Sequence, residues 1–107
     1  MIEIDVVLDE TGFLRSCRAA GHANAGRTGT DIVCASVSVL MRTAVRILSE
    51  RKGIRCHSGA PEPGCLWLEI EYTAEGRDFL SATGEFLITG LRSVAEEFPG
   101  NCKLKVS

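Results

Sequence analysis

Hydrophobic residues recur with two different periods along the chain, and each change of period marks a new element. Apolar positions alternate with polar ones over residues 2–8, as in a strand with one buried face. Residues 13–20 alternate again after a turn signal at residues 9–12, which predicts a hairpin. Residues 54–58 and 65–73 are joined by a segment rich in proline and glycine and predict a second hairpin. Residues 101–107 predict a fifth strand.

Two segments show the helical period instead. From Asp31 to about residue 50 the apolar residues recur at spacings of three and four, which predicts a helix with Asp31 as its N-cap. A second helix is expected from about residue 77 to residue 98, weakened locally by Gly84 and Gly90. The order strand, strand, helix, strand, strand, helix, strand predicts an α+β fold. We expect a two-layer sandwich in which two helices pack on a largely antiparallel or mixed sheet.

Composition narrows the class of protein. The chain has 107 residues, of which 45% are hydrophobic, and this predicts a single domain over residues 1–107. We expect no signal peptide, no membrane span and a cytoplasmic protein, since no basic leader or long apolar run is present. Five cysteines then indicate free thiols in a reducing compartment. A net charge of −2 is not typical of a nucleic-acid-binding protein, so no direct nucleic-acid partner is expected.

The cysteine spacings contain no CxxC pair, so a structural zinc site is not expected, and no metal or other cofactor is predicted. A metal bound by Cys56, His57 and Cys65 is a weaker alternative, because only three candidate ligands are present at irregular spacing.

Candidate chemistry gathers where the second strand is followed by the first helix. If Asp31 caps that helix, Cys34 lies in its first turn, where free N–H groups and the helix dipole favour a thiolate. His22 ends the preceding strand and can pair with this thiol. Ser38 lies one turn beyond Cys34 on the same helical face and can bond the histidine or a substrate carbonyl. Asp31 can also orient the histidine, although capping alone explains it.

Residues 23–30 are small or polar and include Gly26 and Gly29. Such a segment is typical of a mobile loop, and its place between His22 and Cys34 suggests that it gates the site and becomes ordered when substrate binds.

These residues resemble the signature of the ribosomal-processing cysteine protease (Prp) family. The chain reads GHA at residues 21–23 and GTDIVCASVSVL at residues 29–40, and residues 90–99 resemble the family's second helix and its proline stop. The resemblance implies a cytoplasmic, homodimeric endopeptidase that removes the N-terminal extension of large-subunit ribosomal protein twenty-seven. It implies apolar and aromatic substrate residues before the cut and small residues after it. It places the nucleophile at Cys34 and its histidine at His22, with Gly21, Asp31 and Ser38 supporting the site.

Two other functions fit parts of the same pattern. A non-catalytic ribosome-assembly or peptide-binding module can use a helix N-terminus to capture a carboxylate or carbonyl group. A thiol redox sensor is the weaker alternative, because no resolving cysteine lies near Cys34 in the sequence. Turnover separates an enzyme from a binding module.

Overall fold

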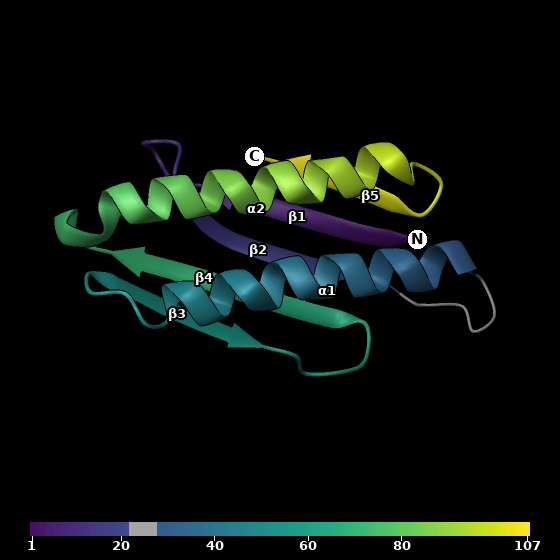
Figure 1. Ribbon diagram of the computed structural model, residues 1–107, viewed down its shortest axis with the longest axis horizontal. Coiled ribbons are helices and arrows are strands. Elements are labelled where there is room, and N and C mark those ends of the chain that lie inside the picture. The colour runs from purple at the N-terminus through teal and green to yellow at the C-terminus, as the bar shows by residue number, and fades with distance from the viewer. Residues whose placement is uncertain (22–27) are drawn as a thin grey trace.

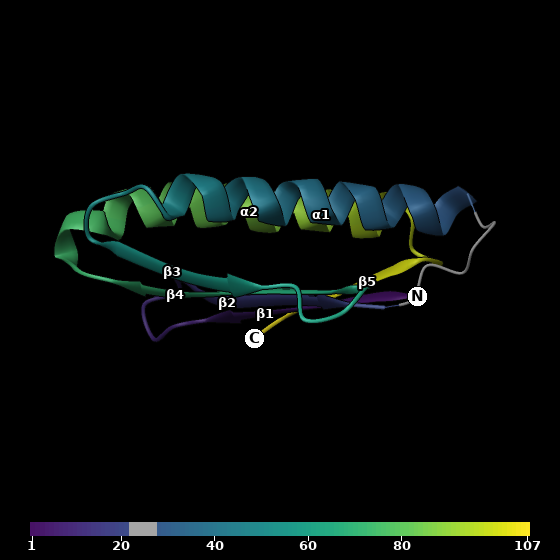
Figure 2. The ribbon, with the colours of Figure 1, turned by 90° about the horizontal axis from the view of Figure 1, so that it is seen from below.

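Two antiparallel helices cover one face of a five-stranded sheet (Figures 1 and 2). The structure, a computed structural model, describes residues 1–21 and 28–107, and for residues 28–30 it describes the backbone alone. The elements in chain order are β1 (Ile2–Leu8), β2 (Leu14–Ala20), α1 (Thr28–Leu48), β3 (Ile54–Gly59), β4 (Cys65–Tyr72), the 3₁₀ turn η1 (Ala74–Gly76), α2 (Arg77–Glu97) and β5 (Cys102–Val106). Neither helix has an apolar stretch long enough to cross a membrane, within the described residues.

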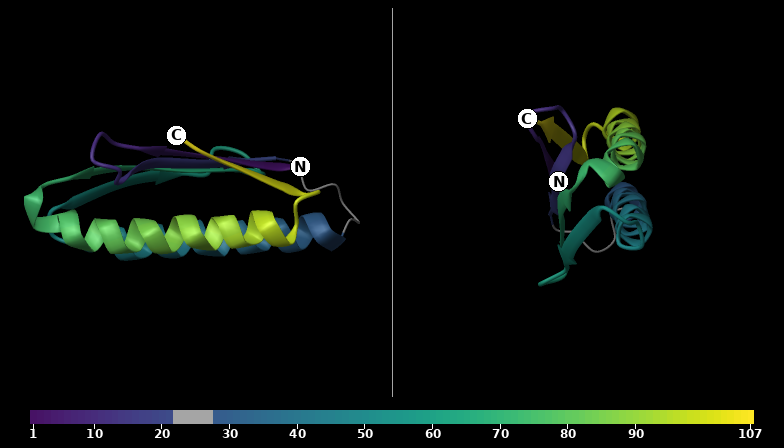
Figure 3. Two further views of the ribbon diagram at one scale, coloured as in Figure 1. Left: turned by 90° about the horizontal axis from the view of Figure 1, so that it is seen from above. Right: turned by 90° about the vertical axis from the view of Figure 1, so that its left-hand side faces the viewer.

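The sheet is mixed, with strand order β3-β4-β2-β1-β5. All neighbouring strands are antiparallel except β1 and β5, which are parallel. The end-on view in Figure 3 shows both helices on the same face. Of the strands, α1 contacts β3, β4 and β1, whereas α2 contacts β2 and β5. The α+β two-layer sandwich predicted from the order of elements is therefore confirmed.

The core lies between the sheet and the helices. Alternation brings one face of each central strand inward, and the helical period brings one stripe of each helix onto that face. The fully buried large side chains are Ile4, Val6, Leu14, Leu68, Val33, Met41, Leu48, Leu80, Leu87 and Leu91. This burial sets how each helix is rotated about its own axis.

The two glycines of α2 are points of close packing. A Cβ atom on Gly84 would lie 3.1 Å from Cβ of Leu14 on β2, and one on Gly90 would lie 2.9 Å from Cδ2 of Leu40 on α1. From the sequence alone, the only expected effect of these glycines is to weaken the helix. In the structure their missing side chains allow α2 to approach both the sheet and α1.

The first helix begins earlier than predicted. Asp31 lies within the first turn of α1 and is not its N-cap, because Thr28–Thr30 are already helical. Aspartate still interacts favourably with the helix dipole from a first-turn position. Threonine, glycine and aspartate all occur at helix starts, so the sequence did not distinguish a helix that begins at Thr28 from one capped by Asp31.

Two glycines hold the β3–β4 loop against the end of β2. The N–H of Gly21 donates to the carbonyl of Gly64 at 3.0 Å. A Cβ on Gly21 would collide with the carbonyl oxygen of Met1, and a Cβ on Gly64 would collide with the carbonyl oxygen of Gly21. Gly64 also has φ +82°, which side chains disfavour. This contact, the Gly21–Gly64 brace, places the loop beside α1.

A carboxylate stabilises the β1–β2 turn at the opposite end of the sheet from the brace (Figure 1). Asp9 accepts hydrogen bonds from the hydroxyl of Tyr72 at 2.5 Å and from the hydroxyl of Thr11 at 2.7 Å. It also accepts from the backbone N–H groups of Thr11 and Phe13, each at 2.9 Å. The bond from Tyr72, followed by those from Thr11 and Phe13, holds the pKa of the Asp9 carboxyl well below its usual value.

The brace predicts the effect of Gly64→Ala, with Gly12→Ala as the matched control. Both glycines have positive φ, so each alanine costs about 1–2 kcal/mol for conformation alone. A Cβ on Gly12 meets nothing within 4 Å, whereas one on Gly64 meets Gly21. We expect Gly64→Ala to lower the free energy of unfolding, measured in urea, by roughly 1–3 kcal/mol more than the control does. Equal losses would contradict a tight contact at Gly64.

The Asp9 bonds predict a pH dependence of stability. Because the pKa of Asp9 in the folded protein lies below its value of about 3.8 in an unfolded chain, the contribution of these bonds to stability is fully present above that pH. It is lost progressively as the pH falls below it. We expect the urea midpoint of Asp9→Asn to lie below that of the wild type at pH 7, with the gap narrowing towards pH 3. Glu10→Gln, a change at the exposed neighbour, serves as the control. Its urea midpoint should equal that of the wild type at each pH.

Candidate active site

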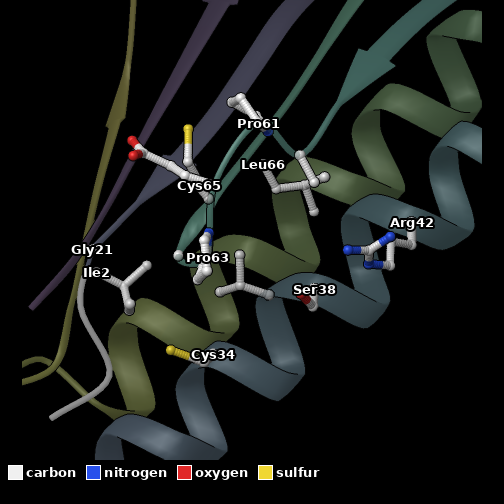
Figure 4. Close-up of a pocket in the computed structure, with 14 residues that line it drawn as sticks. Ile2, Gly21, Cys34, Ser38, Arg42, Pro61, Pro63, Cys65 and Leu66 are labelled. Atoms are coloured by element: carbon white, nitrogen blue, oxygen red, sulfur yellow. The ribbon is translucent and has the colours of Figure 1, made fainter.

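A cavity of about 620 Å³ opens between α1, the β3–β4 loop and the end of the sheet where β2 stops and β4 starts (Figure 4). Its size falls within the usual range of small-molecule and peptide side-chain pockets. Most of its lining is apolar and comes from three separate parts of the chain. The lining residues are Ile2, Ala19, Gly21, Cys34, Val37, Ser38, Arg42, Ala60, Pro61, Glu62, Pro63, Gly64, Cys65 and Leu66.

One face of α1 forms a long wall of this cavity. Cys34, Ser38 and Arg42 follow one another at intervals of four residues, so they lie on the same side of the helix (Figure 4). Each follows or lies beside a member of the buried stripe that includes Val33, Val37 and Met41. Burial of that stripe therefore turns the row Cys34–Ser38–Arg42 towards the cavity. The thiol of Cys34 is half-buried and accessible from it.

The hydroxyl of Ser38 is available to a ligand. Ser36 and Ser93 each donate to the carbonyl four residues earlier, at 2.8 Å and 2.9 Å. Within the described part of the chain, the Ser38 hydroxyl makes no such bond to the helix backbone or to another side chain. Because Ser38 lines the cavity one turn from Cys34, its hydroxyl can donate to a group bound there.

Three of the five thiols lie away from the cavity, and their surroundings disfavour the thiolate. Desolvation raises the pKa of Cys17 to about 12, assisted by the nearby charge of Asp5. Desolvation also raises the pKa of Cys56 and that of Cys102 above the usual value. A raised pKa suppresses the thiolate, which is the reactive form. The remaining two, Cys34 and Cys65, are the thiols that line the cavity.

Cys65 does not face Cys34, although both residues contribute to the cavity. Strand alternation turns Leu66 and Leu68 towards the helices and Cys65 towards the open face of the sheet. There the guanidinium of Arg18 donates to its sulfur at 3.8 Å. Figure 4 shows the Cys65 sulfur directed away from Cys34. The two thiols therefore lie on different sides of the β4 backbone, which argues against the redox-sensor alternative.

Gly21, Cys34 and Ser38 come together at the cavity, whereas Asp31 does not. The Asp31 side chain is exposed and is not among the lining residues. His22 and Gly26 lie outside the described residues, as does most of the predicted gating loop. The prediction that this loop extends to residue 30 is wrong, because Gly29 belongs to the first turn of α1.

The predicted position of Cys34 in the first turn is also wrong. With α1 starting at Thr28, Cys34 lies in the second turn. In an α-helix its N–H bonds the carbonyl four residues earlier, so this N–H is not a free donor for an oxyanion. Nor are those of Gly21 and Cys65 free, since they donate to the carbonyls of Gly64 and Glu62.

Sequence reasoning did not identify three contributors to the cavity: Arg42, Leu66 and the loop of residues 60–64. The helical period provided a signal for Arg42, which lies two turns beyond Cys34. No local signal connected the loop to Cys34, because the Gly21–Gly64 brace joins segments that are distant in sequence. On the open face, Trp67 is half-buried, and its indole ring lies across Gly59, where a Cβ would approach it to 2.9 Å.

The described part of the chain forms no cluster of metal ligands. Among residues 1–21 and 28–107, no three histidine, cysteine or acidic side chains gather closely enough to bind one. Cys56 pairs with Ile70 near one end of β4, while Cys65 begins that strand at its other end, so these two cannot share an ion.

Several solved structures share this fold over essentially the whole chain. The ribosomal processing protease Prp from S. aureus in complex with a substrate peptide has a TM-score of 0.83 and 21% identity, covering 100% of both chains. The same enzyme with a covalently linked product peptide has a TM-score of 0.81 and 22% identity, again covering 100% of both chains. SMU.848 from Streptococcus mutans has a TM-score of 0.81 and 27% identity over 99% of this chain and 93% of its own. Comparison with curated proteins finds no match.

The sequence itself carries the family relationship. The sequence model of the family described as cysteine protease Prp matches residues 1–103, almost the full length of the chain. This match includes the segment that contains Cys34 and the strands and helices that build the cavity around it. The expected family is thus confirmed, and the non-catalytic alternative is set aside: the chain belongs to the cysteine protease Prp family and is an enzyme of the cysteine-protease class.

Proposed function

We propose that the protein is an endopeptidase in which Cys34 is the nucleophile and His22 its base. His22 takes the proton of the Cys34 thiol, and the thiolate attacks the carbonyl carbon of the scissile peptide bond. The tetrahedral intermediate collapses with loss of the amine, which receives the proton from the imidazolium. Water, deprotonated by the same histidine, then hydrolyses the thioester and restores the thiol.

The position of Cys34 carries this proposal. Within a family of cysteine proteases, Cys34 is the half-buried thiol directed at the cavity. The sulfur of Cys65 is directed away from it, and Cys17, Cys56 and Cys102 do not line the cavity. The partner histidine follows Gly21 in the sequence, and Gly21 lines the same cavity.

Ser38, Gly21 and Asp31 receive supporting roles. The Ser38 hydroxyl is a donor one turn from Cys34, suited to the histidine or to a substrate carbonyl. Gly21 acts through the brace, because any side chain there would collide with the carbonyl of Met1. Asp31 contributes through the helix dipole from the first turn of α1.

We propose that the substrate is the N-terminal extension of large-subunit ribosomal protein twenty-seven. Family membership supports a ribosomal role, since the related S. aureus enzyme is a ribosomal processing protease that binds a substrate peptide. The apolar lining from Val37, Leu66 and the loop prolines suits apolar residues before the cut. The same resemblance supports a homodimer that works in the cytoplasm.

The first test replaces the nucleophile. We expect Cys34→Ala to abolish cleavage of a peptide spanning the extension while the melting curve stays close to that of the wild type. The change removes one sulfur atom from a half-buried position beside a cavity. Cys56→Ala, at another half-buried cysteine outside the cavity, should retain cleavage. Mass spectrometry of the products measures both. Wild-type turnover by Cys34→Ala would overturn the assignment of the nucleophile.

If Cys34→Ala is folded but inactive, the nucleophile is supported, and the identity of the natural substrate needs a separate test. The ribosomal protein of the host, with its natural N-terminus, is incubated with the wild-type enzyme, and its mass is measured. Loss of the extension supports the ribosomal assignment. A protein that is not shortened contradicts that assignment, even if short peptides are cleaved.

The second test addresses the base. We expect His22→Ala to slow both proteolysis and iodoacetamide alkylation of Cys34 at pH 7, because the thiolate loses its base or counter-ion. Peptide mapping identifies the alkylated residue. His57→Ala, a change at an exposed histidine on β3, serves as the control. If Cys34 is alkylated equally fast in the wild type and in His22→Ala, the dyad is wrong.

A further inference from the structure

A single arginine stands in the cavity wall at a fixed distance from the nucleophile. We infer that Arg42 is a specificity-determining residue that binds a side-chain oxygen of the substrate, carried by an acidic or carboxamide residue three or four positions from the scissile bond. The inference rests on the proposed function, because it concerns the same peptide that Cys34 attacks.

The helix sets the distance between Arg42 and Cys34. The two residues are separated by two turns on the same face of α1, which corresponds to about 12 Å along the helix axis. An extended peptide advances about 3.3 Å per residue. A peptide lying along α1 with its scissile carbonyl at Cys34 therefore brings its third or fourth residue beside Arg42. Figure 4 shows the row from Cys34 through Ser38 to Arg42 along this wall.

Arg42 has no partner within the part of the chain that the structure describes. The only ion pair there joins Arg77 to Asp78, and no hydrogen bond involves the Arg42 guanidinium. Glu62 lines the opposite wall, but its carboxylate is not within ion-pair distance of Arg42. A guanidinium has five N–H donors and no acceptor, so it binds oxygen acceptors, and carboxylates most strongly.

The other lining residues determine which ligands the charge of Arg42 favours. Of the lining residues that the structure describes, Arg42 is the one cation and Glu62 the one anion, and most of the rest are apolar. A single oxygen acceptor close to the α1 wall gains the contact with Arg42, whereas a lysine at the same place is repelled.

The chain provides a matched control in Arg46. It lies one turn beyond Arg42, near the end of α1, and is exposed like Arg42. Unlike Arg42, it does not line the cavity. A change at Arg46 alters the net charge of the protein equally but leaves the charge of the cavity unchanged.

The test is a positional scan. A parent peptide has apolar and aromatic residues before the cut and small residues after it, and Glu, Gln or Lys replaces each of four positions on either side in turn. We expect one position, the third or fourth from the scissile bond, at which Glu improves kcat/KM roughly tenfold over Lys, mainly through KM. Gln should fall between them.

Three variants assign that preference to its source. Arg42→Gln should remove the difference between Glu and Lys, Arg42→Glu should reverse it, and Arg46→Gln should keep it. Circular dichroism confirms that each variant is folded. A Glu preference that survives in Arg42→Gln overturns the inference, as does a wild-type enzyme that cleaves the Glu and Lys peptides equally. A wild type that cleaves no peptide at all overturns the proposed function and this inference with it.

Discussion

Burial of one stripe of α1 against the sheet is the constraint on which the site depends. The stripe comprises Val33, Val37, Met41, Ala44 and Leu48, all at most 5% exposed. Each larger member contributes about 1.5–3 kcal/mol when buried, so turning the helix would cost far more than any single polar contact at its surface returns. The rotation of α1 is thereby set, and the row Cys34–Ser38–Arg42 faces the cavity as a consequence.

The elements could be predicted from the sequence because their signals are local. Alternation over β1 and the helical period over α2 each arise within a few consecutive residues. The start of α1 was misplaced, since Thr28–Thr30 and Asp31 all suit a helix N-terminus. That error moved Cys34 from the second turn to the first and suggested a free N–H that the helix uses itself.

The cavity could be predicted only in part, because distant segments build it. Cys34 and Ser38 share a helical face, so the sequence brought them together correctly. The opposite wall depends on the Gly21–Gly64 brace. Glycine is needed at both positions because backbone atoms from distant parts of the chain leave no room for a Cβ, and no local sequence pattern shows this. Gly90 illustrates the same limit, since only the position of Leu40 explains why a side chain is absent there.

The second-turn position of Cys34 changes which groups could assist it in the proposed reaction. A first-turn thiol has free backbone N–H groups around it, but at Cys34 the helix has already used them. Among the described residues, the free donors of the α1 wall are then the Ser38 hydroxyl and the Arg42 guanidinium, one and two turns away. Both side chains start from the same rigid helix, so the spacing of their Cα atoms from that of Cys34 is constant. Such a wall selects a substrate by the distance between its scissile bond and its polar groups, because flexible loops are not needed to set that distance.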